Sequence, residues 1–93
     1  MSNSRELRKI VMESNQRRIL DQLEHIDEAI QNLAEKIRRQ TELAKENPDE
    51  LTFRVTQIVH LLMWAVPNLS IDSLLSTVAE YEKSKVWYEV TNE

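Results

Sequence analysis

The chain has 93 residues, of which 41% are hydrophobic and 30% charged, and its formal net charge is −4. It contains no glycine, no cysteine and two prolines. These absences exclude disulfides, cysteine-type zinc sites and glycine-dependent phosphate loops. The acidic balance argues against a protein that coats nucleic acid by charge alone. The abundance of helix-favouring residues predicts an all-α protein with a single domain over residues 1–93.

The first expected element is a long helix over residues 4–46, because neither proline nor glycine interrupts this stretch. From Met12 onward its apolar residues alternate in steps of four and three, which is the heptad pattern of helices that pack along one another. Leu20 and Ala34 lie beside this seam and widen it toward the face of a bundle helix. The residues predicted to form an oligomer interface are Met12, Ile19, Leu23, Ile26, Ile30, Leu33 and Ile37.

The segment Asn47-Pro48-Asp49-Glu50 predicts the start of a second helix. Asn47 suits the N-cap, Pro48 has no amide to leave unpaired, and Glu50 suits the third position of a capping box. We expect this helix over residues 48–65, with Pro67 ending it. It is hydrophobic around most of its circumference, which is typical of a helix that contacts two partners.

A third helix is expected over residues 71–85, with Ser70 as its N-cap. A C-terminal tail, residues 86–93, either continues this helix or extends and packs. Trp87 and Tyr88 in the tail are candidate contacts to a partner protein, and the alternative is that they pack over helices of the same chain. The apolar residues expected to point inward from the third helix are Ile71, Leu74, Leu75, Val78 and Tyr81.

Helix lengths predict assembly. A helix of roughly 40 residues is about 60 Å long, whereas each of the later helices reaches about 27 Å. Unless the later helices lie end to end, part of the apolar stripe stays exposed, and a second chain is expected to cover it. We therefore expect an oligomeric, in the first place dimeric, coiled-coil-like helical bundle with the long helices antiparallel. The alternatives are a parallel dimer, a tetramer, and a monomeric four-helix bundle whose first helix breaks near residues 15–18.

No residue pattern predicts catalysis, a metal site or a cofactor, and no small-molecule substrate is expected. His25 lies near Asp21 and Glu28 on one helical face, which we interpret as a solvated charged face, because metal sites need ligands from more than one element. His60 lies in an apolar run and is expected in a core or an interface, since the sequence places no nucleophile beside it.

Two basic clusters lie in the long helix, and one of them comprises Lys36, Arg38 and Arg39. Interleaved acidic residues weigh against nucleic-acid binding by either cluster. The candidates for nucleic-acid contact are Arg5, Arg8, Lys9, Arg17 and Arg18.

The longest apolar run, residues 58–66, is too short to span a bilayer, and the first residues lack the apolar core of a signal peptide. We therefore expect a cytoplasmic protein that does not contact membranes. The leading hypothesis is a non-catalytic helical oligomer that acts as a protein–protein interaction, adaptor or small regulatory protein. The alternatives are a small nucleic-acid-binding regulator and an accessory subunit of a larger enzyme or structural assembly.

Overall fold

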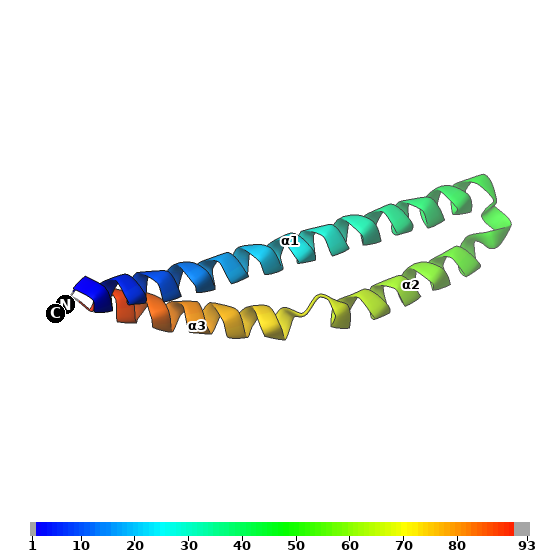
Figure 1. Cartoon of the computed structure of the whole chain (residues 1–93). Helices are drawn as coiled ribbons and strands as arrows, with labels where there is room; N and C mark the ends of the chain where they lie inside the picture. The colour runs from blue at the N-terminus through cyan, green and yellow to red at the C-terminus, as the bar shows by residue number, and fades with distance from the viewer. Residues whose placement is uncertain (1, 91–93) are drawn as a thin grey trace. The chain divides into compact units, whose positions relative to one another are not determined.

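The computed structural model describes residues 2–90, and every element in this range is helical. The elements are α1 (Ser2–Glu46), the 3-10 turn η1 (Pro48–Glu50), α2 (Leu51–Asn68) and α3 (Ile71–Glu89) (Figure 1). The all-α prediction is confirmed, since residues 2–90 contain no strand. The chain divides into unit 1, which combines Met1–Glu24 with Ile71–Glu93, and unit 2, His25–Ser70.

The first helix, α1, runs unbroken from Ser2 to Glu46, so the alternative in which it breaks near residues 15–18 is wrong. Its N-terminal part lies beside α3 within unit 1, and its C-terminal part lies beside α2 within unit 2 (Figure 1). Half-buried side chains recur along α1 in steps of four and three, as expected for a helix that packs along another helix. In unit 1 they include Arg8, Met12, Asn15, Ile19 and Gln22.

The junction between α1 and α2 lacks the expected capping box. The Asn47 side chain makes no capping hydrogen bond, and η1 precedes α2, which begins at Leu51. Glu50 does not reach back to Asn47 because its carboxylate accepts from Arg54, with Oε2 lying 2.7 Å from Nη2. The Glu50 amide donates to the Asn47 carbonyl at 3.0 Å, and this turn-type bond tightens the junction in place of the cap.

The second helix, α2, continues past its expected end and includes Pro67 in its last turn. Proline has no amide hydrogen, so one carbonyl in the preceding turn loses its helical partner. This loss is tolerated near a helix end, where the last carbonyls lack helical partners in any case. Asn68 Nδ2 donates to the Trp64 carbonyl at 2.6 Å, which adds a side-chain hydrogen bond to this end of the helix. Ser70 follows with a φ of 55°, in the left-handed conformation that glycine or asparagine usually adopts after a helix.

The third helix, α3, extends to Glu89, so the first residues of the expected tail continue the helix, and residues 91–93 lie outside the described residues. The most buried side chains of α3 are Thr77, which is 1% exposed, and Ser84. The Thr77 hydroxyl donates to the Ser73 carbonyl at 2.9 Å, and the Ser84 hydroxyl donates to the Tyr81 carbonyl at 2.8 Å. Burial therefore leaves neither hydroxyl unpaired.

The inward face of α3 differs in part from the predicted one. Leu74, Val78 and Tyr81 are half-buried, but Ile71 and Leu75 are exposed. The face that meets α1 is centred on Thr77 and Ser84, and a helix turns by about 100° per residue, so Leu75 points away from α1. The prediction for Ile71 and Leu75 was wrong because apolar residues occupy more than one side of this helix.

Candidate interaction surfaces

Two of the basic residues predicted to contact nucleic acid meet the two aromatic residues predicted to contact a partner, within unit 1. The guanidinium carbon of Arg5 lies 4.6 Å from the centre of the Tyr88 ring, and that of Arg8 lies 5.5 Å from the Trp87 ring. Arg5 Nη1 also donates to the Tyr88 carbonyl at 3.4 Å, and Arg8 Nη1 donates to the Val90 carbonyl at 2.9 Å.

These carbonyls lie at the C-terminal end of α3. The last carbonyls of a helix lack intrahelical partners and form the negative end of its dipole, so cations are stabilising there. The last turn of α3 contains no basic residue. Arg5 and Arg8 supply the missing cations from α1, and we call this pair the arginine cap. Sequence reasoning missed it because the bonded residues are more than 80 positions apart.

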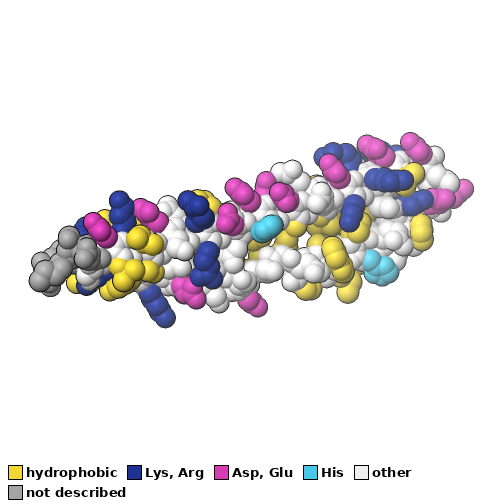
Figure 2. Space-filling view, in the orientation of Figure 1, with side chains coloured by type: hydrophobic (Ala, Val, Ile, Leu, Met, Phe, Trp, Pro, Cys, Tyr) yellow, Lys and Arg dark blue, Asp and Glu magenta, His cyan; other side chains and the backbone are white. Residues whose placement is uncertain are grey.

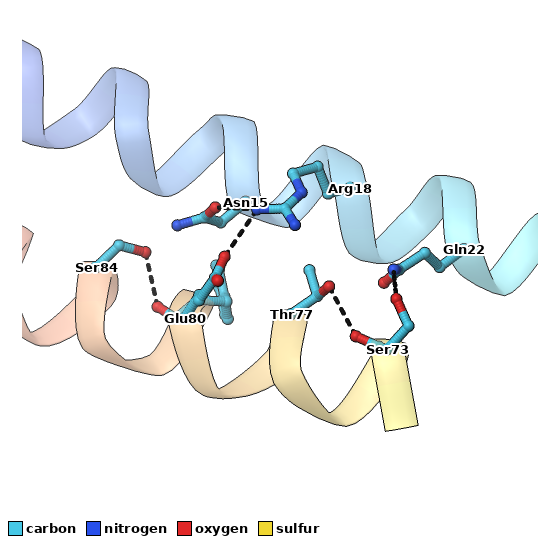
Figure 3. Close-up of polar contacts among 8 residues, drawn as sticks. Asn15, Arg18, Gln22, Ser73, Thr77, Glu80 and Ser84 are labelled. Atoms are coloured by element: carbon cyan, nitrogen blue, oxygen red, sulfur yellow. Dashed lines mark hydrogen bonds and ion pairs between the residues drawn. The ribbon is translucent and has the colours of Figure 1, made fainter. Parts of the chain in front are cut away.

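Two further polar contacts join α1 to α3 (Figure 3). Arg18 Nη1 donates to Glu80 Oε2 at 2.8 Å, and Gln22 Nε2 donates to Ser73 Oγ at 3.1 Å. Both side chains of the Arg18–Glu80 ion pair are about half exposed. An ion pair as exposed as this one adds little to stability.

The two remaining basic candidates lie on exposed surface. Lys9 Nζ lies 3.9 Å from Glu13 Oε1, one helical turn away. Arg17 lines a shallow depression together with Ile10, Glu13 and Ser14. Three of the five predicted nucleic-acid residues, the two arginines of the cap and Arg18, thus contact α3 of the same chain.

The residues predicted for the oligomer interface fall into two groups. Leu23 and Ile30 are exposed. Within a single chain, only α2 and α3 are present to cover the other five. These five half-buried residues are Met12, Ile19, Ile26, Leu33 and Ile37.

One side of unit 2 carries a run of exposed apolar side chains, which we call the apolar face. Five of its residues follow one another along α2 in steps of four or three and so lie on one side of that helix. Ile30 of α1 belongs to the same side of the helical hairpin. Exposure ranges from 43% at Leu62 to 64% at Val66. The apolar face comprises Ile30, Leu51, Val55, Val59, Leu62 and Val66.

The opposite side of the hairpin is hollowed by two adjoining depressions, which we call the basic groove. Their volumes are about 250 and 300 Å³, and Lys36 and Leu61 line both of them. Figure 2 shows lysine and arginine side chains gathered over the C-terminal half of α1, and apolar side chains over α2. The other lining residues are Ala29, Asn32, Leu33, Trp64, Ala65 and Asn68 in the first depression, and Arg39, Gln40, Leu43, Arg54 and Gln57 in the second.

By length and composition, the helical run 48–89 contains a window apolar enough to cross a membrane, contrary to the expectation from the shorter apolar run. The mean hydropathy of this 18-residue window is 1.4, and 6% of it is buried. Core helices of soluble proteins can be equally apolar, but most of their surface is buried. Within the described residues, the surface around α2 is therefore apolar and largely uncovered.

Groups that hold a metal ion are absent from the part of the chain that the structure describes: no three histidine or carboxylate side chains converge there. His25, considered above as a metal ligand, and His60, considered as a catalytic base, are both exposed. His25 belongs to α1 and His60 to the apolar helix α2.

No family model matches the chain, no curated protein matches its sequence and no solved structure matches it.

Proposed function

We propose that this chain is a non-catalytic helical protein that self-associates, in the first place as a dimer, and acts as an adaptor for other proteins. The observation that carries the proposal is how little apolar surface the chain covers by itself. Among the described residues, Ala65 is the only apolar side chain that is buried, at 8% exposure. A second copy seated on the apolar face would convert the two-helix layer of unit 2 into a four-helix bundle.

The area of the apolar face suits a dimer. Its six side chains expose on the order of 600 Å², and each partner in a standard interface contributes roughly 800 Å². Burial of this apolar surface would favour association, and the loss of translational and rotational freedom would oppose it. The size of the face supports the choice of a second copy as its cover.

A bilayer is a less suitable cover than a second copy. Within unit 2, Lys36 and Arg39 lie beside α2 in the basic groove, and Arg54 of α2 bonds Gln40 of α1 and Glu50. Insertion of α2 would either break these contacts or carry charged side chains into hydrocarbon, at about 2.5–3.5 kcal/mol for each charge. A second copy covers the apolar face without disturbing the basic groove.

Nucleic-acid regulation has less support, because Arg5, Arg8 and Arg18 contact α3. An accessory-subunit function would place a different chain on the same apolar face. The nucleic-acid alternative predicts a salt-dependent complex with DNA or RNA that is lost when Arg17 is replaced. The accessory-subunit alternative predicts that a second protein of different mass co-purifies with this chain.

The decisive experiment is the molar mass of the full chain in solution, measured by light scattering at micromolar concentration. We expect a mass of at least two chains, and the mass of a single chain would overturn the proposal. Ile30→Asp and Leu62→Asp should each lower the mass, because both side chains are exposed in the single chain and covered in the dimer. Thr56→Asp, an exposed change on another side of α2, is the matched control and should leave the mass unchanged.

Flotation with neutral phosphatidylcholine vesicles tests the bilayer directly. The wild-type protein should remain with the soluble fraction. If the wild type floats with the vesicles and Leu62→Asp does not, the apolar face meets lipid. The choice of a second copy as its cover would then be wrong.

A further inference from the structure

The basic groove combines apolar and cationic surface. Among the described residues, no aspartate or glutamate lines either of its two depressions, although the chain carries 16 acidic residues against 12 basic ones. Lys36, Arg39 and Arg54 contribute three cations to the lining. A local excess of positive charge on an acidic protein attracts an anionic group to that place.

Small residues create the space at one end of the groove. Ala29 on α1 and Ala65 on α2 both line the first depression, and neither side chain extends beyond Cβ. Half-buried Leu33 and Leu61 supply apolar walls. Trp64, which is 65% exposed, forms a further wall. A hollow with this lining fits an apolar side chain of moderate size.

The cations lie at the rim of this hollow and beyond it. Lys36 Nζ is 5.9 Å from the centre of the Trp64 ring, a cation–π distance that holds the ammonium group at the mouth of the hollow. Arg39 is exposed in the neighbouring depression. Arg54 is partly neutralised by Glu50 at 2.7 Å, so Lys36 and Arg39 are the cations best placed for an incoming carboxylate.

We propose that the basic groove binds a short acidic and apolar segment of another protein. An apolar side chain of that segment enters between Ala29 and Ala65, and a carboxylate about one helical turn away pairs with Lys36 or Arg39. The inference names the partner chemistry of the proposed adaptor function. It does not require self-association, because the groove and the apolar face lie on opposite sides of unit 2.

A peptide suits this surface better than a nucleic acid does. Phosphates would leave the apolar hollow unused, and a duplex lying across α1 would also meet Glu35 and Glu42, which are exposed beside the cations. A single carboxylate meets the cations locally and avoids these glutamates. The groove is small, so a weak, transient contact is expected.

Random peptides of about a dozen residues, displayed and selected against the full-length protein, provide the probe. Enriched peptides should combine a leucine, isoleucine, methionine or aromatic residue with an aspartate or glutamate within about one turn. Synthetic versions would then be titrated by fluorescence polarisation. No enrichment, or enrichment of peptides without acidic residues, would overturn the proposal.

Matched variants test the location of binding. Lys36→Glu and Ala29→Leu should each weaken the peptides about tenfold, the first by charge reversal and the second by filling the hollow. The controls are Lys45→Glu and Ala79→Leu, exposed positions outside the lining, which should change affinity by less than about twofold. Equal effects of groove and control variants would contradict the assignment.

A charge-reversed peptide separates recognition from misfolding. Replacing the peptide's glutamate with lysine should abolish binding to the wild type and restore binding to Lys36→Glu. Failure of this rescue, or tighter binding of single-stranded or duplex DNA than of the peptides to the same groove, would refute a protein segment as the occupant. Either result would leave self-association untouched, since light scattering measures that separately.

Discussion

The guanidinium group of Arg5 stacks over the ring of Tyr88, 4.6 Å from its centre, and also donates a hydrogen bond to the Tyr88 carbonyl. One side chain near the start of the chain therefore binds both the ring and the backbone of a residue near its end. Arg8 likewise combines a ring and a carbonyl, but from two residues, Trp87 and Val90. The arginine cap therefore joins the N-terminal end of α1 to the C-terminal end of α3.

Removal of the arginine cap should loosen the C-terminal end of α3. The double variant Arg5→Gln, Arg8→Gln loses the cation–π contacts and hydrogen bonds described above, and we expect it to lower the free energy of unfolding by about 1–2 kcal/mol. Hydrogen exchange should accelerate at the amides of residues 85–89. Lys9→Gln is the control, since its exposed contact with Glu13 is worth little. Unchanged exchange in the double variant would show that the cap does not hold α3.

Thr77 should tolerate loss of its hydroxyl but not an increase in size. Thr77→Leu adds volume at a side chain that is 1% exposed and should cost about 1–3 kcal/mol through overpacking against α1. Thr77→Val keeps the shape and should cost less than about 1 kcal/mol. Thr56→Leu is the matched control. The Thr56 hydroxyl also donates to the carbonyl one turn earlier, that of Thr52, but Thr56 is exposed. Similar unfolding midpoints for both leucine variants would contradict close packing at Thr77.

Ser70→Gly should stabilise the protein by about 0.5–1 kcal/mol. A residue with a side chain pays about 1–2 kcal/mol in the left-handed conformation that Ser70 adopts, and glycine removes that penalty at some cost in unfolded-state entropy. The same change at exposed Ser76, inside α3, should instead destabilise by about 0.5–1 kcal/mol. Urea unfolding of the two variants measures the contrast, and a shift of the same sign in both would count against a left-handed Ser70.

The Arg18–Glu80 ion pair should contribute only weakly. A double-mutant cycle with Arg18→Gln and Glu80→Gln should give a coupling energy of about 0.5 kcal/mol, because both side chains are about half exposed. Coupling should shrink as sodium chloride is raised, through screening. A coupling energy above about 2 kcal/mol, or one independent of salt, would mean that the pair is far better shielded from water than its exposure indicates.

Features that depend on neighbouring residues could be predicted from the sequence. The absence of helix breakers indicated a long first helix, and Asn47-Pro48 indicated a boundary close to where η1 begins. The detailed geometry of that boundary was not predictable, because Glu50 has two possible partners and the cationic side chain of Arg54 displaces the Asn47 amide. The local pattern located the junction, and the ion pair with Arg54 determines where the Glu50 carboxylate binds.

Features that depend on how helices meet could not be predicted. Apolar residues on α3 form more than one stripe, so the sequence favoured Ile71 and Leu75 as inward residues, whereas packing against α1 buries Thr77 and Ser84. The basic groove and the apolar face of unit 2 both arise from the pairing of α1 with α2, because each surface contains residues from both helices. The heptad pattern predicts a partner helix for the seven seam residues, and a helix of the same chain or of a second copy satisfies that pattern equally well.

The burial of a single apolar side chain, Ala65, among the described residues has a consequence for mutational scans of this protein. In a chain with a large interior, costly substitutions map that interior and obscure the surface used for recognition. Here the interior is small, so few costly substitutions, such as Thr77→Leu, would report on it, and most of the others would mark what touches the chain from outside. A scan of all single substitutions, selected for function in the source cell, would therefore identify the residues that contact binding partners.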